Sequence, residues 1–221
     1  RYPPDQGFDS FVAAPEAALA QLRLLAENPS ADWLYVAGVA KTGKTHLALA
    51  LCAATEQAGR RAVYLPMAAA VGRTREALEA LEGNDVIALD GLEAAAGTRE
   101  DEVALFDFHN RARAAGLNVL YTARGVPDEI GLTLPDLRSR LSQCARVILS
   151  PLDDDGRRQV LRDRAHRRGL VLEEAAIEWL LTRTDRDLGH LTGMLEVLDR
   201  ESLAAQRRVT VPFLRSILEA R

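Results

Sequence analysis

The sequence has few cysteines, no long apolar run and no strong excess of either charge. Its two cysteines, Cys52 and Cys144, lie far apart in apolar surroundings, which excludes a disulfide framework and the ligand spacing of a zinc site. The longest apolar run, Leu47–Ala54, is far too short to span a bilayer, and there is no secretory signal. The formal net charge of −4 gives no electrostatic reason to expect nucleic acid as the main ligand. We therefore expect a cytoplasmic protein with no membrane partner and no strong direct DNA binding.

The 221 residues have an ordinary globular composition and a regular alternation of strand and helix patterns. The predicted strands are Trp33–Ala37, Arg61–Leu65, Asp85–Leu89, Leu117–Thr122 and Arg146–Leu149. The predicted helices between them are Thr45–Ala58, Thr74–Leu81, Glu100–Ala115 and Leu134–Gln143. Strands that alternate with helices form mostly parallel sheets covered on both faces. The pattern predicts an α/β fold, with a five-stranded, mostly parallel sheet sandwiched by helices, over residues 1–150.

From Pro151 onward the pattern is helical only, which predicts a small all-helical lid subdomain over residues 151–221. Its predicted helices are Asp153–Arg168, Glu173–Thr184, Asp187–Gln206 and Val211–Ala220, with Asp153 and Thr210 as N-caps. The first of these helices carries six arginines: Arg157, Arg158, Arg162, Arg164, Arg167 and Arg168. Acidic residues precede them, which favours a solvated helix face whose charges suit the helix dipole. A docking surface for a protein partner or nearby DNA is the alternative.

A phosphate-binding loop is the strongest local signal in the sequence. The pattern G-x-x-x-x-G-K-[ST] is matched in full by Gly38, Val39, Ala40, Lys41, Thr42, Gly43, Lys44 and Thr45, between a predicted strand and a predicted helix. The two glycines let the backbone curl so that successive N–H groups point at phosphate oxygens. Lys44 would reach the β- and γ-phosphates, the Thr45 hydroxyl would bind Mg²⁺, and the helix adds its positive dipole end. The loop predicts nucleotide binding.

Asp90 follows the apolar run that ends at Leu89, the position of the second magnesium-holding carboxylate in P-loop proteins. Many hydrolysing P-loop ATPases place a further acid directly after this aspartate, to orient or deprotonate the attacking water. Here that residue is Gly91, which can do neither. Glu93 lies close in sequence but at a different angle, so we expect it to be a weak substitute. We expect a protein that binds nucleotide well and hydrolyses ATP very slowly by itself.

Four further segments resemble the DnaA branch of the AAA+ family, and within it the Hda-like regulators, over essentially the whole chain. Phe8-Asp9-Ser10-Phe11 resembles the opening motif before the first helix, in a segment that wraps the adenine in that branch. The stretch 105–110 (Leu-Phe-Asp-Phe-His-Asn) and the stretch 134–141 (Leu-Pro-Asp-Leu-Arg-Ser-Arg-Leu) are similar to Hda-like sequences. So is the ending from Asp199 through Gln206 to Phe213. A generic AAA+ domain need not contain the last two.

The resemblance implies a regulator of replication initiation. Hda-like proteins bind ADP and associate with the DNA-loaded sliding clamp. They stimulate hydrolysis of the ATP held by DnaA, and they lack the DNA-binding domain of DnaA. Arg140 matches the arginine finger that acts in trans, and Thr122 matches the sensor position near the γ-phosphate. Arg138, two residues before Arg140, is expected to be a surface residue. The resemblance thus implies ADP or ATP with Mg²⁺ as cofactors, DnaA and the clamp as partners, and possible self-association. The clamp contact is expected in a peptide ahead of Arg1.

One position departs from the family pattern. The family has an arginine in the third helical segment of the lid that reaches back to the phosphates, and Gly189 falls at that position, with Arg186 nearby as a substitute. This leaves the preference between ADP and ATP open. Two other functions also stay open. One is a DNA-stimulated AAA+ ATPase similar to a helicase loader, and the other is an adaptor that uses nucleotide only as a structural ligand.

Overall fold

The structure, a computed structural model, describes residues 7–11, 15–183, 194–195, 197–198 and 209–218. It divides into two compact units, Arg1–Pro151 and Leu152–Arg221, which are described separately. Among the described residues, no helix is both long enough and apolar enough to cross a membrane.

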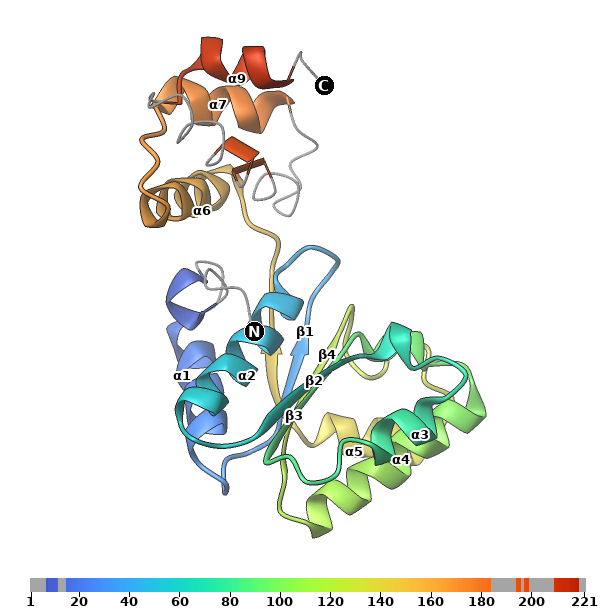
Figure 1. Cartoon of the computed structure of the whole chain (residues 1–221). Coiled ribbons are helices and arrows are strands. Elements are labelled where there is room, and N and C mark those ends of the chain that lie inside the picture. The colour runs from blue at the N-terminus through green and yellow to red at the C-terminus, as the bar shows by residue number, and fades with distance from the viewer. Residues whose placement is uncertain (1–6, 12–14, 184–193, 196, 199–208, 219–221) are drawn as a thin grey trace. The chain divides into compact units, whose positions relative to one another are not determined.

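The first unit is built on a five-stranded sheet in the order β2-β3-β4-β1-β5 (Figure 1). The strands are β1 (Leu34–Ala37), β2 (Ala62–Pro66), β3 (Val86–Asp90), β4 (Asn118–Ala123) and β5 (Ala145–Ile148). Every neighbouring pair is parallel. The predicted α/β fold is confirmed, and the sheet is entirely parallel where the sequence predicted a mostly parallel one.

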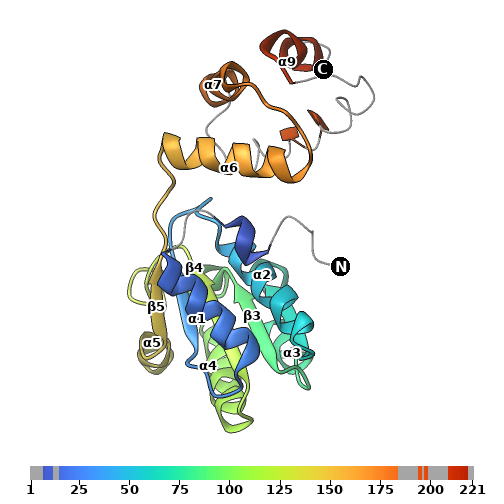
Figure 2. The same cartoon turned by 90° about the vertical axis from the view of Figure 1, so that its left-hand side faces the viewer.

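Helices cover both faces of this sheet, with α1 and α2 on one side and α3, α4 and α5 on the other (Figures 1 and 2). The helical elements are η1 (Phe8–Ser10), α1 (Glu16–Glu27), α2 (Lys44–Gln57), η2 (Met67–Ala69), α3 (Thr74–Glu79), η3 (Leu92–Ala94), α4 (Arg99–Ala114) and α5 (Pro135–Ser142). Successive strand residues point to opposite faces, so Leu34 and Val36 pack with α1 and α2, whereas Tyr35 packs with α4 and α5. Burial on both faces explains why the central strands are continuous apolar runs.

A buried aromatic cluster lies beneath α4. The Nδ1 atom of His109 lies 3.1 Å from the Tyr121 hydroxyl, and the His109 ring packs edge-on against Trp33 at 4.7 Å between centroids. The Arg113 guanidinium covers the Trp33 ring at 4.0 Å. Burial, followed by the charges of Arg113 and Arg140, lowers the pKa of His109 to about 4. The imidazole is therefore neutral in the folded protein.

This cluster predicts a pH-dependent stability. The pKa of His109 is near 6.5 in the unfolded chain and about 4 in the folded chain. The contribution of His109 to the free energy of unfolding is therefore fully present above pH 6.5 and is lost as the pH falls from 6.5 towards 4. Melting temperatures measured between pH 7.5 and 4.5 should fall more steeply for the wild type than for His109→Gln, which carries no titrating group. Equal slopes for the two proteins would show that His109 does not titrate in this way.

The second unit contains α6 (Asp154–Arg167), α7 (Glu174–Arg183) and α9 (Val211–Leu218), packed around an apolar cluster. Asp153 caps α6, since its carboxylate accepts a 2.7 Å hydrogen bond from the Gly156 N–H. Thr210 lies at the start of α9, where its hydroxyl accepts a 3.4 Å hydrogen bond from the Phe213 N–H. Both predicted caps are confirmed. The predicted helix 187–206 lies mostly outside the described residues.

The arginines of α6 are partly neutralised by acidic neighbours. Arg157 pairs with Asp154, Arg158 pairs with both Asp155 and Glu178, and Arg162 pairs with Glu174. For three of the six arginines, these pairs support the interpretation of α6 as a solvated helix face whose charges are balanced by acidic residues.

Candidate nucleotide site

The two glycines of the loop are required by its close packing. A Cβ atom on Gly38 would lie 2.7 Å from the Leu149 carbonyl oxygen and 2.8 Å from Thr42 Oγ1. Gly43 has φ of +93° and serves as N-cap of α2, and a Cβ there would overlap the Phe11 ring. The loop therefore follows β1 directly and delivers the amino end of α2, with its unpaired N–H groups, to the carboxyl end of the sheet.

Lys44 lies inside the curl of this loop and is 9% exposed. Its ammonium donates hydrogen bonds to the carbonyl oxygens of Gly38 (2.6 Å) and Val39 (2.8 Å). Burial lowers the pKa of Lys44, and the carboxylates of Glu93 and Asp90 oppose that effect. The cation is thus held where phosphate oxygens could replace the two carbonyls as its partners.

Asp90 gathers three hydroxyl donors at the carboxyl ends of neighbouring strands. Its Oδ2 atom accepts from Thr45 Oγ1 (2.7 Å) and from the Tyr64 hydroxyl (2.9 Å), and its Oδ1 atom accepts from Thr122. The sheet register explains this, because Asp90 pairs with Thr122 of β4 and β2 ends beside it. The structure therefore brings the predicted residues Thr45, Asp90 and Thr122 together.

Tyr64 joins this group, although no sequence pattern singles it out. Its hydroxyl reaches Asp90 only because β2 and β3 are paired in a register that ends at the loop. Burial, followed by the Asp90 charge, raises the pKa of Tyr64 well above its usual value. The phenol is therefore a permanent donor to Asp90.

The N-terminal segment packs against the start of α2. His46 Nε2 lies 3.1 Å from the Gly7 carbonyl oxygen and 3.3 Å from Ser10 Oγ, and the Phe11 and His46 rings lie 5.1 Å apart. Phe8, the predicted adenine contact, is 6% exposed and belongs to the core cluster beside α1 and α2. Phe8 therefore anchors the segment, and Phe11 is the aromatic residue that reaches the loop at Gly43.

Arg140 lies at the other end of the sheet. It belongs to α5, which is followed at once by the start of β5, and β5 runs parallel to β1. The carboxyl end of α5 is thus near the amino ends of the strands, whereas the loop follows the carboxyl end of β1 (Figure 1). Arg140 is exposed, and its guanidinium has no hydrogen bond or ion pair with any described residue. Arg138, by contrast, pairs with Asp128 at 3.2 Å.

A buried carboxylate fixes the segment that leads into α5. Glu102 of α4 accepts hydrogen bonds from the backbone N–H groups of Gly97 (2.7 Å), Thr133 (3.0 Å) and Leu134 (2.6 Å), and from the Thr133 hydroxyl (3.0 Å). These donors hold the pKa of Glu102 below its usual range although burial acts in the opposite direction. Glu102 therefore fixes the start of α5, the helix that carries Arg140.

Glu102→Ala is expected to lower the free energy of unfolding by about 2–4 kcal/mol, because each donor left unpaired costs about 1–3 kcal/mol and water can satisfy part of the set. Denaturant unfolding would measure this loss. The matched control is Glu100→Ala, an exposed carboxylate in the same helical turn, which should cost less than about 1 kcal/mol. A similar small loss for both variants would contradict the anchoring role.

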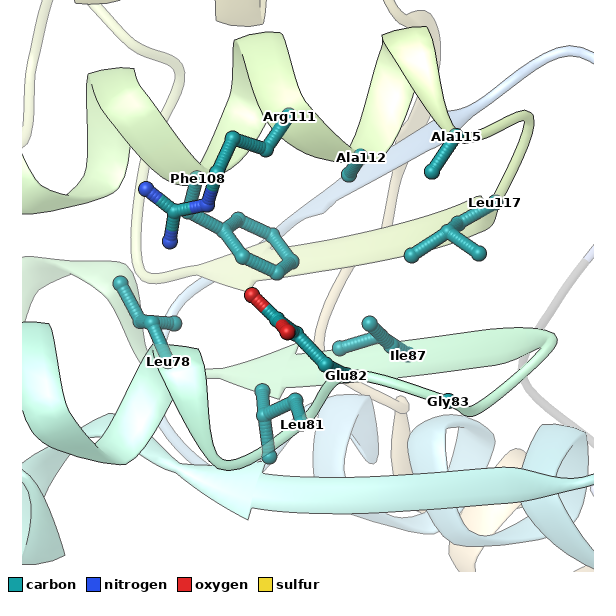
Figure 3. A pocket seen from close by; sticks show the side chains of 10 residues that line it. All are labelled: Leu78, Leu81, Glu82, Gly83, Ile87, Phe108, Arg111, Ala112, Ala115 and Leu117. Atoms are coloured by element: carbon teal, nitrogen blue, oxygen red, sulfur yellow. The ribbon is translucent and has the colours of Figure 1, made fainter.

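A separate hollow of about 320 Å³ lies between α3, α4 and the first residues of β3 and β4 (Figure 3). Its walls are mostly apolar, including Leu81, Ile87 and Phe108, and it also carries the charged side chains of Glu82 and Arg111. Because it lies at the amino ends of these strands, it is distinct from the site formed by Asp90 and the loop. Among the described residues, there is no group of three or more His, Cys, Asp or Glu side chains that could hold a metal ion by themselves.

Comparison with known proteins assigns the second unit. Residues 154–218 match the family model described as "Hda, lid domain". The helical unit is thus similar to the Hda lid domain. The usual lid arginine position, Gly189, and its neighbour Arg186 lie within the matched range but outside the described residues.

Solved structures assign the fold of the whole chain. Domain III of the Thermotoga maritima replication initiation protein DnaA is 19% identical, with a TM-score of 0.80 and coverage of 100% of this chain and 98% of that one. AMPPCP-bound DnaA from Aquifex aeolicus is 20% identical (TM-score 0.71; 89% and 66% covered). The Thermotoga maritima RuvB Holliday junction branch migration motor is 16% identical (TM-score 0.66; 99% and 72% covered). The chain therefore has the AAA+ fold of DnaA domain III and a helical unit that matches the Hda lid model, and the predicted resemblance is confirmed at that level.

Proposed function

We propose that this protein is an Hda-type regulator of replication initiation. It binds ADP in the loop 38–45 and, with the DNA-loaded sliding clamp, stimulates hydrolysis of the ATP held by DnaA. Arg140 supplies the arginine finger. We also propose that it works in the cytoplasm, in keeping with its two buried cysteines, which are not joined in a disulfide.

The placement of Arg140 carries the proposal. An exposed guanidinium that lies at the end of the sheet opposite its own phosphate loop is suited to a nucleotide on another molecule. A planar guanidinium stabilises the charge that develops on the γ-phosphate. Arginine fingers increase the rate of nucleotide hydrolysis by about 10³- to 10⁵-fold. Since Gly91 deprives this chain of the acid beside Asp90, its own site is poorly equipped for hydrolysis.

The loop geometry supports an adenine nucleotide with magnesium. The fold relative from Aquifex aeolicus is AMPPCP-bound, which favours the same ligand class here. Thr45 Oγ1 and Asp90 Oδ2 lie 2.7 Å apart, so both oxygens could serve one Mg²⁺, which prefers oxygen ligands. Thr45 would bind the ion directly, and Asp90 would hold it with Thr122 and Tyr64 as supporting donors. The bound ion would neutralise phosphate charge.

The test is phosphate release from mixtures of DnaA, ATP, DNA-loaded clamp and the full-length protein. We expect release to rise only when DnaA, the clamp and the protein are present together. DNA-stimulated hydrolysis without DnaA would favour the helicase-loader alternative, against which the ion pairs of α6 already argue. Loss of folding without ADP, together with no effect on DnaA, would favour the adaptor alternative.

A further inference from the structure

The carboxylate of Glu93 lies close to Gly91, the position at which the further acid is missing. Gly91 adopts a left-handed conformation (φ 82°, ψ 55°), and a Cβ atom built on it would lie 3.8 Å from Glu93 Oε1. The single turn of η3 folds Glu93 back over Gly91, so a position three residues after Asp90 in sequence returns to its side. The sequence predicted a weak substitute at a different angle, and the structure shows that the Glu93 carboxylate turns back towards Gly91.

Glu93 also lies within electrostatic reach of the phosphate loop. Its charge is the largest of those that act to raise the pKa of Lys44, ahead of Asp90. Its side chain is 26% exposed, so water can reach the carboxylate. A partly exposed carboxylate near Gly91, the residue that follows Asp90, can accept a hydrogen bond from water at a bound triphosphate.

Arg124 holds this carboxylate from the other side. Its Nε lies 3.1 Å from Glu93 Oε1, and its backbone N–H donates a 3.1 Å hydrogen bond to Glu93 Oε2. Arg124 follows Thr122 by two residues, so its contact with Glu93 continues the contact between Thr122 and Asp90 at the strand ends. Both oxygens of Glu93 are thus engaged by Arg124.

We propose that Glu93 replaces the acid missing at position 91 as the residue that orients the attacking water, and that Arg124 restrains it as an autoinhibitory ion pair. The inference rests on the proposed nucleotide site. In the latent reaction, the water oxygen forms a bond to the γ-phosphorus of ATP while the bond from that phosphorus to the β–γ bridging oxygen breaks. The bridging oxygen leaves with ADP, and a water proton passes through the Glu93 carboxylate to the released phosphate. The Arg124 pair keeps this reaction slow.

Single-turnover hydrolysis of ATP bound to the full-length protein tests the proposal. Arg124→Ala should hydrolyse up to about fivefold faster than the wild type, since an exposed ion pair of this kind contributes about 0.2–1 kcal/mol. Arg124→Lys, which can keep the pair, should remain near the wild-type rate. The double variant Arg124→Ala/Glu93→Gln should lose the gain and hydrolyse at the rate of Glu93→Gln alone. The matched control is Arg75→Ala, which breaks the exposed Arg75–Asp107 pair (3.0 Å) on α3 and α4 and should change nothing.

An Arg124→Ala rate at or below that of the wild type would overturn the inference, as would a double variant as fast as Arg124→Ala. ADP affinity and DnaA stimulation measured on the same proteins separate the two proposals. Absence of nucleotide binding by the wild type would overturn both. Tight binding without stimulation of DnaA would overturn only the regulator function.

Discussion

Lys44→Ala is expected to weaken ADP binding at least about 100-fold. A hydrogen bond between a charged group and its partner contributes about 1.5–3 kcal/mol, and tenfold in affinity corresponds to about 1.4 kcal/mol, so two lost phosphate contacts reach this range. The fold should survive, because truncation of Lys44 opens space through which water can reach the carbonyl of buried Gly38 and that of exposed Val39. Isothermal calorimetry measures the affinity, and circular dichroism confirms the fold.

The chain offers a sharp control for this experiment, since its only two lysines are Lys41 and Lys44. Amine acetylation followed by mass spectrometry of the loop peptide therefore compares these two lysines directly. ADP should protect Lys44 strongly and Lys41, which is exposed, much less. Lys41→Ala should weaken binding less than about tenfold, because its side chain lies outside the curl of the loop. Unchanged ADP affinity in Lys44→Ala would show that the loop is not the nucleotide site.

Arg140→Ala is expected to reduce stimulation of DnaA-bound ATP hydrolysis by about 10³-fold or more, the lower end of the range for arginine fingers. Truncation removes the guanidinium, and its effect on the fold should be small because the side chain is exposed and has no partner among the described residues. Arg140→Lys should restore little, since an ammonium lacks the planar fork. Stimulation is measured as the rate of phosphate release from preloaded DnaA.

Arg138→Ala is the matched control, because it removes an arginine from the same helix but one that already pairs with Asp128. It should retain nearly all of the stimulation, since an exposed pair contributes about 0.2–1 kcal/mol. Equal losses in the two variants would point to general damage to α5 and would contradict a specific role for Arg140. Retained stimulation in Arg140→Ala would exclude the finger outright.

The sheet and the phosphate loop could be predicted because their signals are local. Strands buried on both faces give continuous apolar runs, and the loop needs a fixed order of glycine, lysine and threonine. Asp90 was predictable for the same reason, since it ends one of those runs. The Asp153 cap likewise depends on residues within one turn.

The contacts that complete the site depend on strand register and could not be predicted. Tyr64 reaches Asp90 from β2, and Arg124 reaches Glu93 from β4, across 26 and 31 residues of sequence. The position of Glu93 required the left-handed turn at Gly91, which a sequence pattern does not specify. Phe8 was predicted as an adenine contact, and its ring is 6% exposed in the core cluster beside α1 and α2. Sequence alone does not distinguish a buried ring from one that stacks on a ligand.

The most direct test of the account follows the phosphate that leaves DnaA itself. DnaA is loaded with γ-labelled ATP and mixed with DNA-loaded clamp and full-length protein, with excess unlabelled ADP to fill the loop 38–45 of the regulator. The account predicts that release of labelled phosphate accelerates with the concentration of the protein, reaches a plateau and disappears with Arg140→Ala. Release at the basal rate of DnaA at every concentration would contradict it.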